Sequence, residues 1–219
     1  MLLLKPIKMK TIFRFFTVIL LLVISNSCIK KDPNSIKIGT QIWSSVNLNV
    51  DHFGNGDAVP HAKSSEQWMK AGENKTPAWC YYDNDAKNAK KYGKLYNWYA
   101  VVDPRGLAPK GWHVPTDVEW KKLSDFLGGD TVSGTKMKKA SGWDANGSGD
   151  NSTGFTGLPG GCRLHYGGFS NMGNDGSWWS QTEDDVENAW YRDLNSSLPN
   201  LYSYSSFKDY GFSVRCVKD

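Results

Sequence analysis

The stretch "PTDVEWKKLSDFLGG", residues 115–129, decides the fold because it predicts one well-bounded helix. Thr116 and Glu119 have the spacing of a capping box, in which each side chain bonds the other residue's backbone N–H at a helix start. Three large apolar residues then recur on one helical face, Trp120, Leu123 and Leu127. The glycine pair 128–129 ends the helix, because glycine readily adopts left-handed backbone.

Weaker signals on either side predict further short helical segments. Ser65–Lys70 predicts a helical turn inside a polar stretch that Gly and Pro punctuate. Asp83–Asp85 supplies caps for one or two helical turns that end near Gly93, and a shorter helix is expected around Thr131–Lys139. Aromatic and β-branched residues fill Leu95–Val102, which fits a strand or an aromatic helix, since periodicity does not separate the two.

Alternation of apolar and polar residues predicts an antiparallel sheet. Ile36–Trp43 alternates around a turn at Gly39 and predicts a hairpin. A surface loop rich in Gly, Asn and Ser follows the helices at Asp144–Gly157. Four short β-like segments come after it, Cys162–Tyr166, Ser177–Thr182, Ala189–Leu194 and Phe212–Val217. The expected fold class is α+β, a loop-rich domain with one or two helices and a short-stranded antiparallel sheet.

The N-terminal segment has the three parts of a signal peptide. Basic residues precede the apolar run Phe15–Ile24, which is too short to span a bilayer as a helix. Small residues follow, and "ISNSC" resembles a bacterial lipobox, whose cysteine is lipidated. We expect residues 1–27 to be a signal peptide, 28–35 a tether lipidated at Cys28, and 36–219 one domain. The expected location is the bacterial outer membrane, with the domain facing the periplasm or the cell surface.

The net charge of +4 belongs to the predicted signal peptide. Its basic residues have no acidic counterpart before Cys28, and they are Lys5, Lys8, Lys10 and Arg14. The rest of the chain is net neutral, so nucleic acid is not expected as a partner. Three cysteines follow Cys28, and spacing alone does not choose among the possible disulfide pairs of Cys80, Cys162 and Cys216.

Several ordered motifs resemble one bacterial family. They are "YGKLYNWYAVVDPRGLAPKGWHVPTDVEWKKLSDFLGG" (92–129), "GFTGLPGG" (154–161), "WWSQTE" (178–183), "NAWYRDL" (188–194) and "YGFSVRCVKD" (210–219). Together they resemble the Fibrobacter succinogenes major paralogous domain family from about Ile36 to the end of the chain. That family occurs in exported and lipid-anchored bacterial proteins and has no established biochemical activity.

A more distant likeness bears on the fold. "HVPTDVEW" (113–120) is similar to a helix start in formylglycine-generating-enzyme-like domains, and "GFSVRC" (211–216) is similar to their terminal strand. Those domains belong to the C-type-lectin-like folds, so the likeness implies a loop-rich domain whose two ends share a sheet. It does not carry over catalysis, because Cys216 has no nearby cysteine in sequence.

Sequence motifs of hydrolases and metalloenzymes are absent. Neither G-x-S-x-G nor H-E-x-x-H occurs, and the histidines have no metal-site spacing: His52, His61, His113 and His165. Oxygen-rich loops suit calcium, and acids cluster at Asp83/Asp85, at Asp150 and at Glu183–Asp185. None of these clusters has an EF-hand pattern, so solvated turns are preferred, no cofactor or metal is predicted, and the chain is not expected to be an enzyme.

Aromatic residues remain as the candidate ligand-binding groups. They stack on sugar rings or fill a core that is poor in regular structure, and most are expected to be core. Neighbouring residues in a strand face opposite sides, so one of Trp178 and Trp179 is expected outward, whereas Tyr202 and Tyr204 share a face. The candidate platform lies on the hairpin 178–194 and on Leu201–Phe207, and comprises Trp178, Trp179, Trp190, Tyr191, Tyr202 and Tyr204.

The expected function follows from the anchor and the aromatic residues. We expect a lipid-anchored, non-catalytic binding module for carbohydrate or another extracellular polymer. The alternative is a structural or adhesion protein of the cell envelope that acts through protein–protein contacts.

Overall fold

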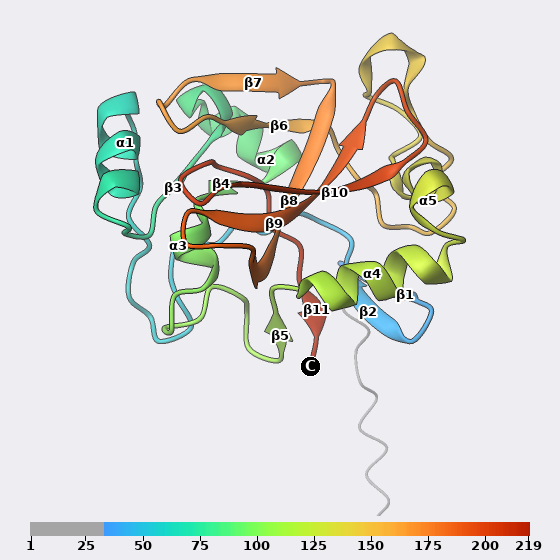
Figure 1. The fold of residues 1–219 in the computed structure, drawn as a ribbon, viewed down its shortest axis with the longest axis horizontal. Helices are drawn as coiled ribbons and strands as arrows, with labels where there is room; N and C mark the ends of the chain where they lie inside the picture. The colour runs from blue at the N-terminus through green and yellow to red at the C-terminus, as the bar shows by residue number, and fades with distance from the viewer. Residues whose placement is uncertain (1–32) are drawn as a thin grey trace, which may run out of the picture. The chain divides into compact units, whose positions relative to one another are not determined.

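In the computed structural model, which describes residues 33–219, strands from both ends of the described chain meet in one sheet (Figure 1). Its order is β1-β2-β11-β5, and its members are β1 (Ser35–Ile38), β2 (Gln41–Ser44), β11 (Val217–Lys218) and β5 (Trp112–His113). β1 and β2 form the predicted hairpin, and Gly39 has the positive φ of 60° that its turn needs. The predicted signal peptide and Cys28 lie outside the described residues.

A larger sheet crosses the centre of the molecule (Figure 1). Its order is β10-β9-β8-β6-β7, and its members are β6 (Gly160–Arg163), β7 (Phe169–Met172), β8 (Asp175–Glu183), β9 (Asn188–Asn195) and β10 (Leu201–Phe207). All neighbours pair antiparallel except β6 and β8, which are parallel. The predicted segments 177–182 and 189–194 thus lie within strands, whereas the prediction for 162–166 is right only for 162–163, because the chain leaves β6 after Arg163 and turns. The prediction for 212–217 is wrong as a continuous strand, because Phe212 and Ser213 form only isolated bridges before β11.

Helices lie at both ends of the larger sheet, α1 at one and α4 and α5 at the other (Figure 1). The predicted capping box is confirmed at α4 (Asp117–Phe126), and the second helix is α5 (Asp130–Met137). The turn predicted at 65–70 is the longer α1 (Ser65–Glu73). The helical turns predicted from Asp83–Asp85 to near Gly93 are confirmed, because Asp85 caps a 3₁₀ turn and α2 (Ala89–Tyr92) ends at Gly93. The described chain has more helices than the one or two expected, and α3 (Trp98–Val101) is too short for periodicity to reveal. Three 3₁₀ turns complete the set, Tyr82–Asn84, Ala86–Asn88 and Asp144–Asn146.

The segment 95–102, which periodicity left open, is a strand followed by a helix. β4 (Leu95–Tyr96) pairs with β3 (Trp79–Cys80) in a two-stranded sheet. Asn97 then changes the structure, because its side-chain oxygen accepts from the N–H of Ala100 at 3.1 Å and caps α3. The same oxygen accepts from the N–H of Ala78 at 2.9 Å, so the cap also ties α3 to the chain before β3.

The core has two main parts, one on each face of the larger sheet. Trp179 packs with Tyr96, Trp98 and Phe212 on one face. Trp178 packs on the other with residues of α4, α5 and the first hairpin, including Trp43, Trp120 and Met137. Both tryptophans are fully buried. The expectation that one of them faces solvent is therefore wrong, because the sheet is covered on both sides at this point.

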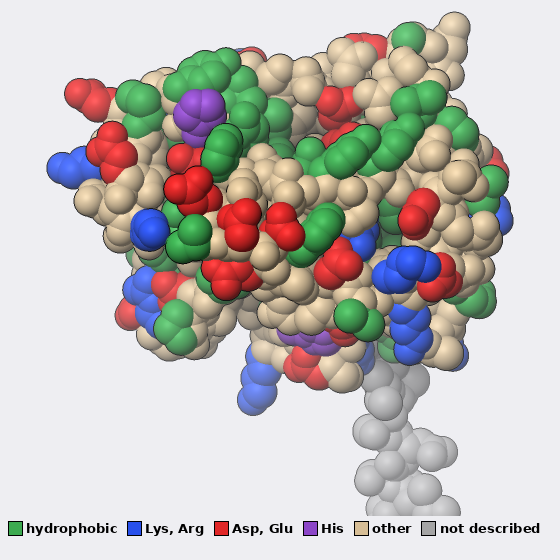
Figure 2. Space-filling model, viewed as in Figure 1, with side chains coloured by type: hydrophobic (Ala, Val, Ile, Leu, Met, Phe, Trp, Pro, Cys, Tyr) green, Lys and Arg blue, Asp and Glu red, His purple; other side chains and the backbone are tan. Residues whose placement is uncertain are grey.

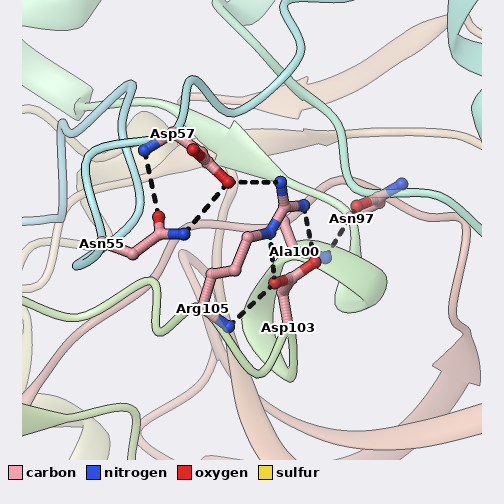
Figure 3. Close-up of polar contacts among 6 residues, drawn as sticks. All are labelled: Asn55, Asp57, Asn97, Ala100, Asp103 and Arg105. Carbon is pink, nitrogen blue, oxygen red and sulfur yellow. Dashed lines mark hydrogen bonds and ion pairs between the residues drawn. The ribbon is translucent and has the colours of Figure 1, made fainter.

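Arg105 fastens two loops at the surface (Figure 3). Its guanidinium donates to both carboxylate oxygens of Asp103, at 2.8 and 2.9 Å, and to Asp57 at 3.4 Å. Asn55 donates to the same oxygen of Asp57 at 3.0 Å. The guanidinium also lies 4.1 Å from the ring centroid of Phe53. One arginine thus joins loop 51–58 to the turn that follows α3.

Within residues 33–219, no helix is long and apolar enough to cross a membrane.

Candidate functional site

Three tyrosines and two aspartates share one face of the larger sheet. β9 and β10 place Tyr191 opposite Tyr204 and Asp193 opposite Tyr202. β8 places Ser177 opposite Asp193, and Asp175 lies two residues before Ser177 on the same side. We call this surface the tyrosine–aspartate face, defined by Tyr191, Tyr202, Tyr204, Asp175 and Asp193.

The tyrosines form a continuous aromatic surface. Tyr202 and Tyr204 are stacked, with ring centroids 5.3 Å apart and planes 11° from parallel, so the predicted shared face is confirmed. Tyr204 is 46% exposed and lies 6.0 Å from Tyr191. Tyr191 in turn packs at 4.5 Å against buried Phe212, which anchors the surface in the core. Among the described residues, none of the three phenolic hydroxyls has a hydrogen-bond partner, so all three remain able to bond a ligand.

Asp193 is a half-buried carboxyl with one oxygen in use. The hydroxyl of Ser177 donates to its Oδ1 at 2.7 Å, and no described residue bonds its Oδ2. Burial raises the pKa of Asp193 to about 7, the Ser177 hydrogen bond opposes that rise, and the charge of Asp175 adds to it. A carboxyl beside an aromatic surface with a free oxygen and a pKa near neutrality is a strong candidate for ligand contact.

Asp175, in contrast, has both oxygens in use. Asn195 donates to Oδ1 and Asn171 donates to Oδ2, each at 2.7 Å. Burial raises the pKa of Asp175, and these two carboxamides partly offset the rise. The arrangement fixes the carboxyl in place and leaves amide groups beside it, which are polar groups of the kind that bond sugar hydroxyls.

The six predicted platform residues do not all reach a common surface. Trp178 and Trp179 are buried on opposite faces, so neither contacts a ligand in this conformation. Trp190 is half-buried and pairs with Ser205, which puts it on the face opposite Tyr191. Tyr191, Tyr202 and Tyr204 are the ones that the structure brings together.

The two aspartates were missed from the sequence, although a signal for them exists. Asp193 lies two residues after Tyr191, so alternation alone puts both on one side of a strand. The acidic cluster that stands out in the sequence, Glu183–Asp185, instead lies exposed at the β8–β9 turn. Asp175 follows the turn after β7, and only the pairing of β8 with β9 brings it near Asp193.

Negative charge lies at one end of the strands that carry the tyrosine–aspartate face. The turn at one end of the β8–β9 hairpin carries exposed acids, Glu183, Asp184, Asp185 and Glu187. Lys208 contacts Glu183 but is itself buried. On the side of the molecule drawn in Figure 2, acidic side chains gather in the middle and most basic side chains lie near the margin. The local field therefore favours a neutral or cationic ligand over an anionic one.

Two cavities of about 320 Å³ lie away from this face. One is lined by His61, Gln67 and Asn74, and the other by Val46, Leu48 and Trp112. The ring of His61 is stacked on Trp79 with centroids 3.8 Å apart, so this histidine is packed against the core. Within residues 33–219, no three His, Cys, Asp or Glu side chains come together as a metal ion would require.

The three described cysteines are buried and unpaired. Burial raises the pKa of Cys80 to about 11 and those of Cys162 and Cys216 to about 12. All three thiols therefore stay protonated near neutral pH, which makes them poor nucleophiles. None of the three possible disulfides among Cys80, Cys162 and Cys216 is formed.

Comparison with known proteins identifies a family. The sequence model of the Fibrobacter succinogenes major domain matches residues 36–218, which is most of the chain. Comparisons with the curated proteins and with the solved structures give no match.

Proposed function

The chain belongs to the Fibrobacter succinogenes major domain family, and we propose that its tyrosine–aspartate face binds a neutral extracellular polysaccharide without catalysis. The observation that carries the proposal is the stacked pair of half-buried Tyr202 and exposed Tyr204 beside the free oxygen of Asp193. Aromatic faces take the apolar C–H surfaces of sugar rings, while carboxyl and amide groups bond the hydroxyls around the ring edge.

The shape of the surface favours a polymer. Tyr191, Tyr204 and Tyr202 follow one another across two strands with centroid spacings of 6.0 and 5.3 Å. Small ligands are usually held in concave pockets that bury most of their surface. An open row of aromatic rings instead suits a chain of repeated units, each of which contributes a modest contact. The acids around the face argue for an uncharged chain over an anionic one.

Binding is a better proposal than hydrolysis. Glycosidases use two carboxyls, one to protonate the leaving oxygen and one as nucleophile or base. Asp175 and Asp193 are the two carboxyls on this face, but both oxygens of Asp175 accept hydrogen bonds from Asn195 and Asn171. A carboxylate that is held in this way is stabilised where it is, which opposes attack on a sugar carbon.

The cellular setting is part of the same proposal. Lipidation at Cys28 would anchor the domain in the outer membrane, facing the periplasm or the cell surface, with the membrane as one partner. We also propose the C-type-lectin-like architecture, and the pairing of β2 with β11 through Trp43 and Val217 supports it, because the two ends of the described domain then share a sheet.

Polysaccharide pull-down tests the proposal. The full chain is mixed with insoluble cellulose, chitin and xylan, and with polygalacturonate as an anionic polymer. We expect retention on at least one neutral polymer and none on polygalacturonate. Tyr204→Ala should weaken retention and leave the melting temperature nearly unchanged, because Tyr204 is largely exposed. Tyr166→Ala is the matched control, since Tyr166 is 55% exposed and lies outside the tyrosine–aspartate face.

Two results would overturn the proposal. One is no retention of the unaltered chain on any neutral polymer. The other is an equal loss of retention with Tyr166→Ala and Tyr204→Ala, which would mean that the aromatic residues bind nonspecifically.

Protein–protein adhesion is the second candidate function, and the open edge of β10 favours it.

A further inference from the structure

β10 is an edge strand with an unusual composition for an exposed edge. It ends the order β10-β9-β8-β6-β7, and its sequence "LYSYSSF" contains no charge and no proline. Its seven residues pair with β9 without a register shift. Proteins usually protect such edges with charges, prolines or bulges, because the unpaired backbone groups template pairing with another strand. β10 has none of these protections.

The backbone groups that point away from β9 can be assigned. Trp179 N–H donates to the carbonyl of Ser213, and the carbonyl of Ser177 accepts from Ser213 N–H, so these groups of β8 point away from β9. Tyr191 and Asp193 on β9 lie opposite Trp179 and Ser177. In such a pair both residues turn their backbone N–H and C=O groups away from each other, so those of Tyr191 and Asp193 point toward β10.

The same alternation identifies the open groups of β10. Tyr204 and Tyr202 are paired with Tyr191 and Asp193, so their backbone groups bond β9. The N–H and C=O groups of Ser203 and Ser205 therefore point outward. Both serines are exposed, and among residues 33–219 none of these backbone groups has a partner. α5 also contacts β10, and its backbone bond to this region is made just before the strand, where Thr135 N–H donates to the carbonyl of Pro199.

We propose that two copies of this chain pair through their β10 edges, antiparallel and related by a two-fold axis beside Tyr204. The strand is self-complementary in this register. Ser203 of one copy lies opposite Ser205 of the second and exchanges backbone hydrogen bonds with it, while Tyr204 lies opposite Tyr204. No charged residue of either β10 meets a like charge, because the strand has none.

Pairing would join two aromatic surfaces into one. Tyr202 and Tyr204 lie on the same face as Tyr191, so the tyrosine rows of the two copies would meet at the axis on one side of a continuous sheet. The edge pairing itself needs no ligand, and its test is therefore independent of polysaccharide binding.

Cysteine cross-linking of the full chain tests the register. Directly opposed residues of a non-hydrogen-bonded antiparallel pair have Cα atoms about 4.5 Å apart, within disulfide range. Tyr204→Cys should therefore give a disulfide-linked dimer on mild oxidation. In this register Tyr202 of one copy lies opposite Ser206 of the second copy. Tyr202→Cys alone should therefore give no disulfide-linked dimer, whereas a mixture of Tyr202→Cys and Ser206→Cys should give one. The unaltered chain sets the background from its own cysteines.

A second substitution tests whether backbone hydrogen bonds of β10 hold the dimer together. Ser205→Pro removes an outward N–H that the β9 ladder does not use, so it should suppress the Tyr204→Cys dimer while the domain stays folded by circular dichroism. Ser205→Ala keeps that N–H and should leave cross-linking intact. The proposal is overturned if Tyr204→Cys stays monomeric, or if Tyr202→Cys alone cross-links as well as Tyr204→Cys does.

Discussion

Thr116 and Glu119 cap the start of α4 by bonding each other's backbone N–H groups. Glu119 N–H donates to the Thr116 hydroxyl at 3.2 Å, and Thr116 N–H donates to the Glu119 carboxylate at 2.8 Å. The other oxygen of Glu119 lies 2.7 Å from Nε2 of His113, whose Nδ1 lies 2.7 Å from Asp219. The capping box thus also connects the helix to β5 and to the residue after β11.

Thr116→Ala should lower the free energy of unfolding by about 1 kcal/mol, the usual cost of losing an N-cap hydroxyl. Chemical denaturation measures the change. Thr131→Ala is the control, because Thr131 is an exposed helical threonine and the same substitution there removes no cap. Equal effects of the two substitutions would show that the hydroxyl of Thr116 contributes nothing as a cap.

His113 should make stability depend on pH near neutrality. Burial of the ring disfavours its charge, but the hydrogen bonds to Asp219 and Glu119 outweigh burial and raise the pKa of His113. A raised pKa stabilises the fold fully below the unfolded value of about 6.5, and this stabilisation is lost as pH rises through the folded value. His113→Gln should therefore flatten the loss of melting temperature above pH 6.5.

His52→Gln serves as the control, since His52 is largely exposed. Its melting curves should follow those of the unaltered chain from pH 5 to pH 9. If His113→Gln leaves the pH profile unchanged as well, the bonds from His113 to the two carboxylates do not stabilise the fold.

Asp193 should also make stability fall as pH rises, although its pKa is raised by burial and that of His113 by hydrogen bonds. Burial raises the pKa of Asp193 to about 7, so the folded protein binds this proton more tightly than the unfolded chain does. Stability then falls as pH rises from about 4, the unfolded value, to about 7. Asp193→Asn keeps an oxygen for Ser177 and should raise the melting temperature above pH 7. The exposed Asp184→Asn should not, and a lower melting temperature for Asp193→Asn would contradict the assignment.

Arg215 should be among the costliest residues to replace. It is fully buried and donates to the carbonyls of Ser44, Phe155 and Thr156 and to the side chain of Asn47, at 2.7 to 2.9 Å. Arg215→Met leaves these acceptors unpaired, at about 1–3 kcal/mol for each buried group that finds no substitute.

Arg105→Met provides the comparison for Arg215→Met, because Arg105 also makes several polar bonds but is 36% exposed. Water can take the place of its exposed guanidinium at Asp57 and Asp103, so Arg105→Met should cost much less than Arg215→Met. Urea denaturation of both variants separates the two cases. A similar cost for the two arginines would mean that burial does not govern the contribution of Arg215.

The sequence alone predicted those features that depend on residues close together in the chain. The capping box at Thr116, the hairpin turn at Gly39 and the shared face of Tyr202 and Tyr204 all depend on residues within four positions of each other. Alternation also placed Trp178 and Trp179 on opposite faces correctly. It did not reveal that both faces are covered, because the covering residues come from elsewhere in the chain, such as Trp43 and Tyr96.

The candidate site needed long-range contacts that a single sequence does not contain. Asp193 owes its raised pKa to burial in a sheet whose strands are brought together from residues 160 to 207, and Arg215 bonds Asn47 across most of the chain. Neither residue stands out in sequence, where an aspartate in a strand and an arginine near a terminus read as surface groups.

The position of β11 between β2 and β5 sets the timing of folding. Val217 bridges Trp43 on one side and His113 on the other, so the sheet is complete only when residues from both ends of the domain are present together. Contacts of such large sequence separation form slowly. The sheet β1-β2-β11-β5 can therefore close only after Val217 has been synthesised, so its completion is a late event in the folding of the domain.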